Sequence, residues 1–415
     1  MKRSIVLLAL ALTVLLLGFT TPAPAQSSPA KGTVIIPESS IAQPGDEGVR
    51  AHTNVLVFLP DVVEPDTSYP PGENPGSLAC VYKLVKQTKG CEKGNSNFPT
   101  GGSNAIALVD AYDNPDASSD LKTFAKMFFP SVTPNFTQVY ASSGPPGSGC
   151  NGKGSQPPGD EGWGLEEDLD IEYAFGMAPK AHIYLVEAQS SSDSDLFCAE
   201  TVASALVAAA GGGEVSNSWI SYGEDSGETE YDQYFQQTGV VFFAGSGDDG
   251  AGTGYPMVSP YVVSAGGTQI NRDSNGNFTS ESGWSGAGGG PSQYEKRPTW
   301  QNVIKKIVGN HRGTPDLSSD ASPGSAVAIY DSYGYSGWTE VGGTSVASPT
   351  LAGIINAAGT FNSSTTKENT EMYGKYPKEY KVEFRDITTG GNSYGCKKYW
   401  DYCSGIGSPL TYVGK

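Results

Sequence analysis

The chain has 415 residues, of which 17% are charged, and 44 acidic residues outnumber 26 basic ones, for a formal net charge of −18. A pI near 4.6 argues against a nucleic-acid-binding protein, which needs a basic face. The 54 glycines and 28 prolines are too few for a low-complexity chain. Hydrophobic residues make up 37% of the chain, which is enough to build a core. No heptads and no internal repeat are visible, which argues against coiled coils and solenoids.

The first 25 residues are typical of a secretory signal. Lys2 and Arg3 precede the apolar run Ile5–Phe19, and Ala23-Pro24-Ala25 forms a small-residue cleavage site. A membrane anchor is the alternative, but the run is slightly short for one. We therefore expect residues 1–25 to be removed and the mature protein to be exported, soluble and without a membrane partner.

Six cysteines fit an oxidising compartment, and none of them forms a C-x-x-C pair, which makes a zinc ribbon improbable. Many pairings are possible. Short loops favour Cys80–Cys91 and Cys396–Cys403, which leaves Cys150–Cys198. Free thiols are the alternative.

The N-terminal part of the expected mature chain lacks regular patterning. Residues 26–66 are rich in Pro, Ser and Gly and contain one predicted strand, Asn54–Leu59, which indicates an extension or a short pro-segment. Residues 67–103 are loop-like, with a helical stretch around Ala79–Val85.

From about Asn104 onward, strands and helices alternate. Predicted strands are Ala105–Val109, Val139–Ala141, His182–Val186, Val215–Ile220, Val240–Ala244 and Tyr261–Ala265. Predicted helices are Asp120–Phe129, Leu165–Ala178, Asp195–Ala210 and Glu228–Gln237. This alternation predicts an α/β fold, with a mostly parallel sheet flanked by helices on both faces and one domain over residues 67–415. Active sites in such sheets gather where strand ends meet helix starts.

Ser345 lies in Gly342-Gly343-Thr344-Ser345, which reads as a turn entering a helix of small and apolar residues. Free N–H groups at a helix start can hold a developing oxyanion, as acyl transfer requires. Pro349 is expected in the first turn, where its missing N–H costs little. An ordinary N-cap serine is the alternative.

A nucleophilic serine needs a base, and no histidine stands in a catalytic setting. His182 lies inside an apolar strand and is expected in the core, His52 lies in the extension, and His311 lies in a loop. Carboxylates are the other candidates. Glu166 and Asp170 are four residues apart, so on a helix they share one face, where two close acids can share a proton. A solvated acidic helix face is the alternative.

Asp248 lies in Ser246-Gly247-Asp248, directly after the predicted strand Val240–Ala244. It is therefore expected at the carboxyl end of a strand, beside the other candidate residues. A simple turn or a calcium loop would explain this stretch equally well when it is taken alone.

Together these motifs resemble those of the sedolisin family of serine-carboxyl peptidases, in setting and in chain order. The resemblance spans about residues 100–415. It rests on the serine motif, the acidic pair and the Asp248 motif, and on further stretches: Gly254-Tyr255-Pro256, Ser259-Pro260, Gly266-Gly267-Thr268, Gly283-Trp284-Ser285-Gly286-Ala287-Gly288-Gly289-Gly290 and Pro315-Asp316-Leu317-Ser318.

The resemblance implies a subtilisin-like fold and assigns four catalytic roles. Ser345 would be the nucleophile, Glu166 its general base and Asp170 the residue that orients and tunes Glu166. Asp248 would complete the oxyanion hole as a protonated acid. The chemistry agrees, because a histidine with a pKa of about 6.5 is charged near pH 4, whereas a glutamate with a pKa of about 4.3 remains poised to accept a proton.

The family also carries a calcium site near the C-terminus. By resemblance, Asp386 and Asp401 would supply carboxylates, and the carbonyls of Ile387, Lys397 and Tyr399 would complete the oxygen shell of one structural Ca²⁺. The family favours glycine where Lys397 and Tyr399 stand. A turn closed by Cys396–Cys403 is the alternative.

The sequence therefore predicts a secreted, monomeric endopeptidase that acts on proteins or peptides in acid, with its catalytic domain over residues 67–415. An exopeptidase that releases tripeptides and an inactive secreted binding module are the rivals. The family usually has a large folded pro-domain, whereas residues 26–66, about forty in number, are marginal for an independent fold.

Overall fold

The computed structural model describes residues 31–61, 69–145, 147 and 149–412. The predicted signal sequence over residues 1–25 lies outside these ranges. Within them, no helix combines the length and the apolar composition that crossing a membrane requires.

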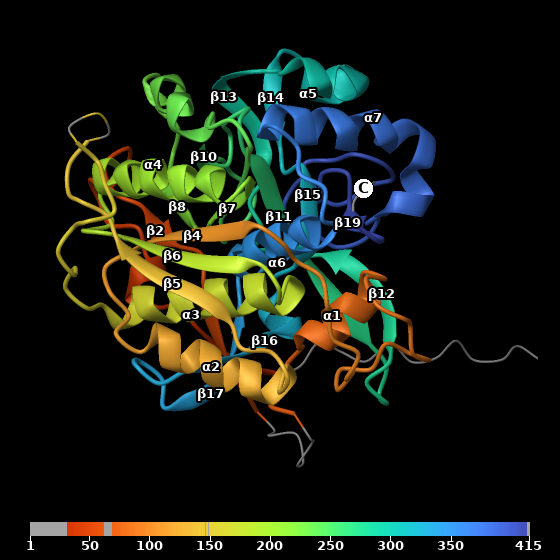
Figure 1. Ribbon diagram of the computed structural model, residues 1–415. Helices are drawn as coiled ribbons and strands as arrows, with labels where there is room; N and C mark the ends of the chain where they lie inside the picture. Colours follow the sequence, from red (N-terminus) through yellow and green to blue (C-terminus); the bar gives the residue numbers. More distant parts are fainter. Residues whose placement is uncertain (1–30, 62–68, 146, 148, 413–415) are drawn as a thin grey trace, which may run out of the picture.

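A central sheet of eight strands organises the fold (Figure 1). Its strands run in the order β12-β11-β9-β7-β4-β6-β5, and β15 also pairs with β11. All pairs are parallel except β11 with β12, as predicted. The strands are β4 (Ala105–Ala111), β5 (Asn135–Tyr140), β6 (His182–Ala188), β7 (Gly213–Asn217), β9 (Val240–Gly245), β11 (Val263–Arg272), β12 (Phe278–Gly283) and β15 (Leu317–Asp320).

Helices cover both faces of this sheet because the inner strands are apolar on both sides. Strand β4, for example, is buried along its whole length. On one face, α2 (Ala117–Phe128) packs against α3 (Glu161–Met177), and α3 packs against α6 (Thr344–Ala357). On the other face, α4 (Asp193–Ala209) packs on β4, β6 and β7. Figure 1 shows α4 on the side of the sheet opposite α2 and α3.

Further elements surround the sheet. They are α1 (Pro75–Val81), β8 (Trp219–Tyr222), η2 (Glu228–Phe235), β10 (Gly254–Tyr255), β13 (Gly290–Lys296), η3 (Thr299–Ile304), α5 (Lys305–Val308), β14 (His311–Thr314), η4 (Pro323–Ser325), β16 (Val327–Asp331), β17 (Gly337–Gly342), α7 (Thr365–Glu383), β18 (Phe384–Arg385) and β19 (Ser408–Pro409). Strands β16 and β17 form the hairpin that leads directly into α6.

The N-terminal segment, residues 31–61, contributes strands to two of the smaller sheets. It contains β1 (Gly32–Ile35), η1 (Glu38–Ser40), β2 (His52–Thr53) and β3 (Leu56–Pro60). Strand β2 pairs antiparallel with β8, whereas β3 pairs antiparallel with both β1 and β17. These long-range pairings bury residues 51–58, although the sequence predicted only one strand here.

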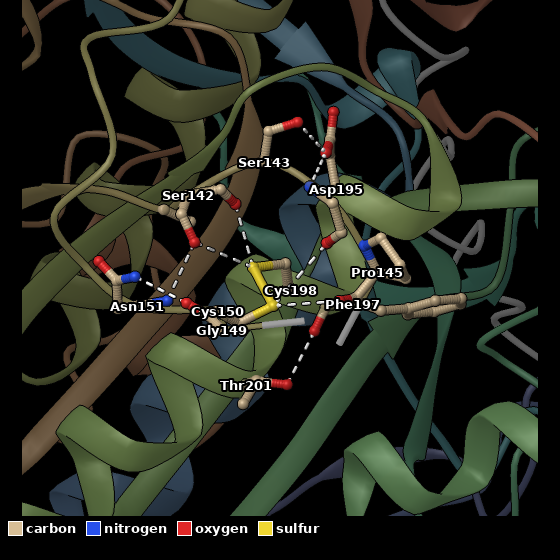
Figure 2. The surroundings of a disulfide bond; sticks show 12 residues. Ser142, Ser143, Pro145, Gly149, Cys150, Asn151, Asp195, Phe197, Cys198 and Thr201 are labelled. Carbon is tan, nitrogen blue, oxygen red and sulfur yellow. Dashed lines mark hydrogen bonds between the residues drawn. A yellow bond between two sulfur atoms is a disulfide. The ribbon is translucent and has the colours of Figure 1, made fainter. Parts of the chain in front are cut away.

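The six cysteines form the three disulfides that the sequence favoured, Cys80–Cys91, Cys150–Cys198 and Cys396–Cys403. The second ties the loop after β5 to α4 (Figure 2). In the same place Ser143 Oγ donates to Asp195 Oδ1 at 3.1 Å.

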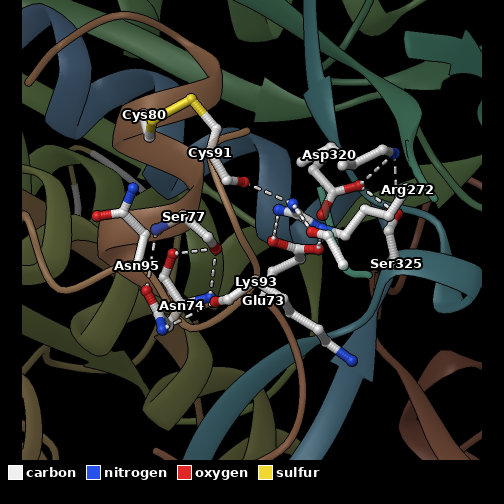
Figure 3. A network of polar contacts seen from close by, with 12 residues as sticks. Glu73, Asn74, Ser77, Cys80, Cys91, Lys93, Asn95, Arg272, Asp320 and Ser325 are labelled. Carbon is white, nitrogen blue, oxygen red and sulfur yellow. Dashed lines mark hydrogen bonds and ion pairs between the residues drawn. A yellow bond between two sulfur atoms is a disulfide. The ribbon is translucent and has the colours of Figure 1, made fainter. Parts of the chain in front are cut away.

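The first disulfide joins Cys80 of α1 to Cys91, and the segment around these residues is bound to β11 by polar contacts. Glu73, just before α1, forms a buried ion pair with Arg272 of β11, and Arg272 Nη1 donates to the Cys91 carbonyl at 2.6 Å (Figure 3). Asn74 caps α1 by accepting from the Gly76 and Ser77 N–H groups.

Several predicted elements differ from the observed ones. The helix predicted at Ala79–Val85 begins earlier, at Pro75, because the Asn74 cap and Pro75 start it. The stretch predicted as the helix Glu228–Gln237 is the 3₁₀ segment η2. His182 lies on the β6 edge next to β5 and is partly exposed, so its expected core position was wrong, and its ring nitrogen lies 2.9 Å from Thr137 Oγ1.

Candidate active site

Ser345 is the second residue of α6 and is completely buried. The chain enters this helix through Gly343, which has a φ of +111°. A Cβ at this position would collide with the Asn54 carbonyl and would lie 2.6 Å from Asp248 Oδ2. Glycine is therefore required at position 343, both for its backbone conformation and for the close approach of these two oxygens.

Pro349 lies beyond the first turn of α6, so its expected first-turn position was wrong. Because proline has no N–H, the Ser345 carbonyl loses its helical partner. The Ser218 hydroxyl reaches this carbonyl instead, at 3.5 Å. The proline thus leaves the backbone of Ser345 open to a side chain from the segment between β7 and β8.

Glu166 and Asp170 lie on α3, which packs against α6, and both side chains are completely buried. The alternative of a solvated acidic face is therefore wrong. The two acids line the part of α3 that faces Ser345, and Asp170 Oδ1 accepts from Ser218 Oγ at 2.6 Å. Ser218 thus contacts both Asp170 and the Ser345 backbone.

Burial raises the pKa of Glu166 well above its usual value, and the neighbouring charge of Asp110 raises it further. The nearby Ser345 hydroxyl lowers the pKa of Glu166, which indicates that the two groups are close. The Ser345 hydroxyl itself donates to the Ser218 carbonyl at 3.3 Å. Burial, followed by the charges of Asp110 and Glu166, raises the pKa of Asp170 well above its usual value.

Asp110 is a third buried carboxyl in this group, and the sequence reasoning missed it. It lies near the carboxyl end of β4, and burial raises its pKa to about 8. Within the described residues, neither of its oxygens has a hydrogen-bond partner. The available signal was an acidic residue in the otherwise apolar strand Ala105–Ala111, because burying a carboxylate without a partner costs free energy.

Asp248 follows β9 and contacts the start of α6. Its Oδ1 accepts from the Thr344 N–H at 2.8 Å and from Thr344 Oγ1 at 2.9 Å. Its Oδ2 has no partner within the described residues, and burial raises the pKa of Asp248 to about 8. In acid this carboxyl is therefore protonated and has a hydrogen to donate from Oδ2.

Residues of the N-terminal segment cover this group of side chains. The Ser345 N–H donates to the Asn54 carbonyl at 3.2 Å, and the Asn54 N–H donates to the Ser218 carbonyl at 3.2 Å. Asn54 O and Asp248 Oδ2 both lie against Gly343. The Asn54 carbonyl oxygen therefore accepts from the Ser345 N–H and lies on the same side of Gly343 as Asp248 Oδ2, a carboxyl oxygen that can donate in acid.

The chain is similar to curated peptidases over most of its length. It is 25% identical to sedolisin from Pseudomonas sp. (strain 101) over 378 residues, which are 81% of this chain and 60% of that protein. It is 28% identical to kumamolisin from Bacillus sp. (strain MN-32) over 353 residues, 75% of this chain and 59% of that protein. A third relative, tripeptidyl-peptidase 1 from Dictyostelium discoideum, is 27% identical over 293 residues, 59% of this chain and 46% of that protein. The predicted resemblance to the sedolisin family is confirmed.

Solved structures support the predicted fold. Pseudomonas sedolisin, described as a serine-carboxyl proteinase in complex with pseudo-iodotyrostatin, superimposes with a TM-score of 0.66 at 23% identity, over 83% of this chain and 96% of that one. Sphericase gives a TM-score of 0.51 at 18% identity, over 80% and 96%. The predicted subtilisin-like fold is confirmed. No family model matches the chain, which spans about 60% of the length of sedolisin and kumamolisin.

The residues predicted to bind calcium lie in the C-terminal loops of the chain. Asp386 Oδ1 accepts from Tyr380 Oη at 2.6 Å and from the Tyr399 N–H at 2.9 Å. Asp401 accepts from the N–H groups of Lys397, Cys403 and Ser404.

The oxygen donors of this loop fit a cation only in part. Among the described residues, no backbone N–H bonds to the carbonyls of Ile387, Lys397 or Tyr399, so these three oxygens are free to bind an ion. The carboxylates, in contrast, are engaged by N–H groups. Cys396 and Cys403 lie close to Asp401 but are joined in a disulfide, so they offer no thiolate.

Proposed function

We propose that the chain is a serine-carboxyl peptidase that acts in acid and cleaves within proteins, with Ser345 as nucleophile, Glu166 as base, Asp170 as the residue that tunes the base and Asp248 in the oxyanion hole. One observation carries the proposal. The Asn54–Val55 peptide of the chain itself crosses Ser345 with its carbonyl oxygen on the Ser345 N–H, as a substrate carbonyl would.

The backbone around this peptide supports the same reading. On its N-terminal side, β2 pairs with β8, and on its C-terminal side, β3 pairs with β17. Pairing of an extended segment along exposed strands is a general way to bind a peptide. A peptide held on both sides of one bond is held for cleavage at that bond.

The path of the chain supports an endopeptidase over a tripeptidyl peptidase. A tripeptidyl site ends three residues before the cleaved bond. Here the chain continues past His52, where the Ala51 N–H donates to the Ser191 carbonyl at 2.9 Å and Arg50 bridges Ser192. Arg50 is exposed, so the route from the site is open to longer chains.

In the proposed reaction, the ionised form of Glu166 accepts the proton of Ser345 Oγ while this oxygen attacks the substrate carbonyl. The oxygen becomes an oxyanion held by the Ser345 N–H and the Asp248 carboxyl. The proton on Glu166 then passes to the leaving amine, and the C–N bond breaks to leave an acyl-enzyme. Water, which gives its proton to Glu166, attacks the acyl group, and return of that proton to Ser345 releases the acid.

We further propose that residues 26–66 are a pro-segment that occupies the cleft until it is cut, and that the mature enzyme is a secreted monomer that takes protein or peptide substrates. The burial of residues 51–58 over Ser345 supports the first part, because no substrate can enter while they remain. The three disulfides support an oxidising compartment.

We also propose one structural Ca²⁺ held by Asp386 and Asp401 with the carbonyls of Ile387, Lys397 and Tyr399. The three free carbonyls fit a hard cation, and the carboxylates would have to exchange N–H donors for it. A bound ion would supply structural stability and no step of the reaction.

Digestion of a denatured protein at pH 3–7 tests the proposed function, with mass spectrometry of the products. Internal cuts are expected in acid. Release of N-terminal tripeptides alone would favour the exopeptidase, and the absence of products at every pH would favour a binding protein on the same fold. The Ser345→Ala variant serves as the matched control for contaminating proteases.

A further inference from the structure

A second group of buried acids lies on the far side of α3 from Ser345. Asp168 and Glu172 of α3 meet Asp120 of α2 and Asp331, the last residue of β16. One carboxylate oxygen from each of Asp120, Asp168 and Asp331 lies within 4.8 Å of the others. We name these four residues the acidic cage.

The cage is closed to solvent and carries no positive charge. All four side chains are buried, and none of the ion pairs found in the described part of the chain involves any of them. Burial and mutual repulsion raise the pKa values of Asp168 and Glu172 well above their usual range. Four buried carboxyls without a cation are costly unless they hold protons or a metal ion.

Asp168, Glu172 and Asp331 each accept hydrogen bonds through one carboxyl oxygen, whereas Asp120 accepts through both. Asp168 Oδ2 accepts from Asn114 Nδ2 at 2.9 Å, and Glu172 Oε2 accepts from the Tyr330 N–H at 3.0 Å. Asp331 Oδ1 accepts from the N–H groups of residues 334 and 335, and Asp120 accepts from Ser332. These bonds fix the carboxyl groups in position without using all of their oxygens.

Three oxygens of the cage remain without a hydrogen-bond partner in the described structure: Asp168 Oδ1, Glu172 Oε1 and Asp331 Oδ2. Each belongs to a completely buried side chain. Buried acceptors of this kind nearly always have a partner. Asp168 and Asp331, which lie in one group with Asp120, therefore each have an oxygen available to a ligand that binds oxygen, such as a hard cation, and Glu172 offers another one helical turn away.

The dimensions suit a calcium ion. Ca²⁺ binds oxygens at about 2.3–2.6 Å, so two ligands on opposite sides of one ion lie about 5 Å apart. The oxygens of Asp120, Asp168 and Asp331 fall within this limit. The turn over residues 332–336 follows Asp331 directly and is partly exposed, which gives an ion a short route to the cage.

We propose that the acidic cage of Asp120, Asp168, Glu172 and Asp331 binds a divalent cation of the Ca²⁺ class, at a site separate from the C-terminal loops and from the Ser345 site. The ion would tie α2, α3 and the β16–β17 hairpin together. Because that hairpin leads into α6, the ion would stabilise the position of the start of α6, where Ser345 lies.

The test measures Ca²⁺ binding to the full chain with Ser345→Ala, which prevents self-digestion, at pH 6.5 by equilibrium dialysis with elemental analysis. The C-terminal residues are removed as ligands by Asp386→Asn with Asp401→Asn. We expect this background to retain about one Ca²⁺ per chain, and Asp168→Asn added to it to lower the affinity at least tenfold. Glu200→Gln, a buried acid on α4 outside the cage, is the matched control and should change nothing.

The absence of Ca²⁺ binding in the Asp386→Asn, Asp401→Asn background would overturn the proposal, as would binding that Asp168→Asn leaves unchanged. A crystal of the Ser345→Ala chain soaked in Mn²⁺ gives a measurement that needs no cage variant. An anomalous peak in contact with Asp168 and Asp331 supports the site, and a map without a peak there refutes it.

Discussion

Replacing Ser218 with alanine removes one hydroxyl that contacts two parts of the proposed catalytic group. Ser218 Oγ donates to Asp170 Oδ1 at 2.6 Å and reaches the Ser345 carbonyl at 3.5 Å. The Ser218 backbone carbonyl, which accepts from the Asn54 N–H, is unchanged by the substitution. The variant should therefore lose tuning of the acid pair while it keeps the backbone contact that binds a peptide.

The expected size of the effect follows from the contact with Asp170. Because the raised pKa keeps Asp170 protonated in acid, its hydrogen bond with Ser218 is one between neutral groups, which contributes about 0.5–1.5 kcal/mol. At about 1.4 kcal/mol for each tenfold change in rate, its loss should lower kcat by roughly 2- to 10-fold. KM should change little. The Ser218 hydroxyl also lowers the pKa of Asp170, so its removal should let Asp170 keep its proton to higher pH and move the acid limb of the kcat profile upward.

The assay is the pH dependence of kcat and KM on an internally quenched peptide, measured on chains freed of the N-terminal segment. Ser216→Ala is the matched control, because Ser216 Oγ is buried and contacts Ser348 Oγ at 2.7 Å rather than a carboxyl. A Ser218→Ala variant that keeps kcat within about twofold with an unshifted pH profile would refute the role of Ser218. A Ser216→Ala variant whose kcat falls as much would refute it too.

Three further predictions concern the nucleophile, pH and calcium. Ser345→Ala should fold, because alanine suits a buried helix start, and should abolish turnover and cutting of the chain's own N-terminal segment; a folded variant that still cuts removes the nucleophile assignment. The melting temperature should fall as pH rises from about 4 to 8, because Asp110 and Asp248, with pKa values of about 8 in the folded chain, keep protons that the unfolded chain releases near pH 4. A melting temperature that rises over this range would contradict the protonation of these two residues. A chelator at pH 5 should lower the melting temperature, and added Ca²⁺ should restore it. An unchanged melting curve, with no bound metal found by elemental analysis, would contradict the proposed calcium binding.

The sequence predicted the sheet and the main helices well because their signals are local. Buried apolar runs such as Ala105–Val109 specify parallel strands, and the spacing of Glu166 and Asp170 specifies one helix face. The resemblance of the motifs to those of the sedolisin family then implied Ser345, Glu166, Asp170 and Asp248. In the structure, the first three side chains are buried between α3 and α6, and the partly buried Asp248 lies beside them after β9.

What the sequence did not predict depends on long-range contacts. Strands β1 and β2 form only because they pair with β3 and β8, and nothing in their own residues fixes those partners. The position of Asn54 over Ser345 follows from these pairings. Asp110 was missed because its role depends on acids that lie far away in the sequence. In the acidic cage, two partners of Asp168 come from other elements, Asp120 from α2 and Asp331 from β16.

The rate of the Glu166→Gln variant at pH 4 tests the central claim most directly, since glutamine keeps the shape of the side chain but cannot take the serine proton. We predict that kcat falls by about 10²- to 10⁴-fold, the usual worth of a positioned base, while Glu200→Gln, a buried acid away from Ser345, stays within a few-fold. His182→Gln and His311→Gln should also stay within a few-fold. A folded Glu166→Gln enzyme that keeps its rate, or one that loses its rate only when a histidine is replaced, would contradict the claim that carboxyl groups activate Ser345.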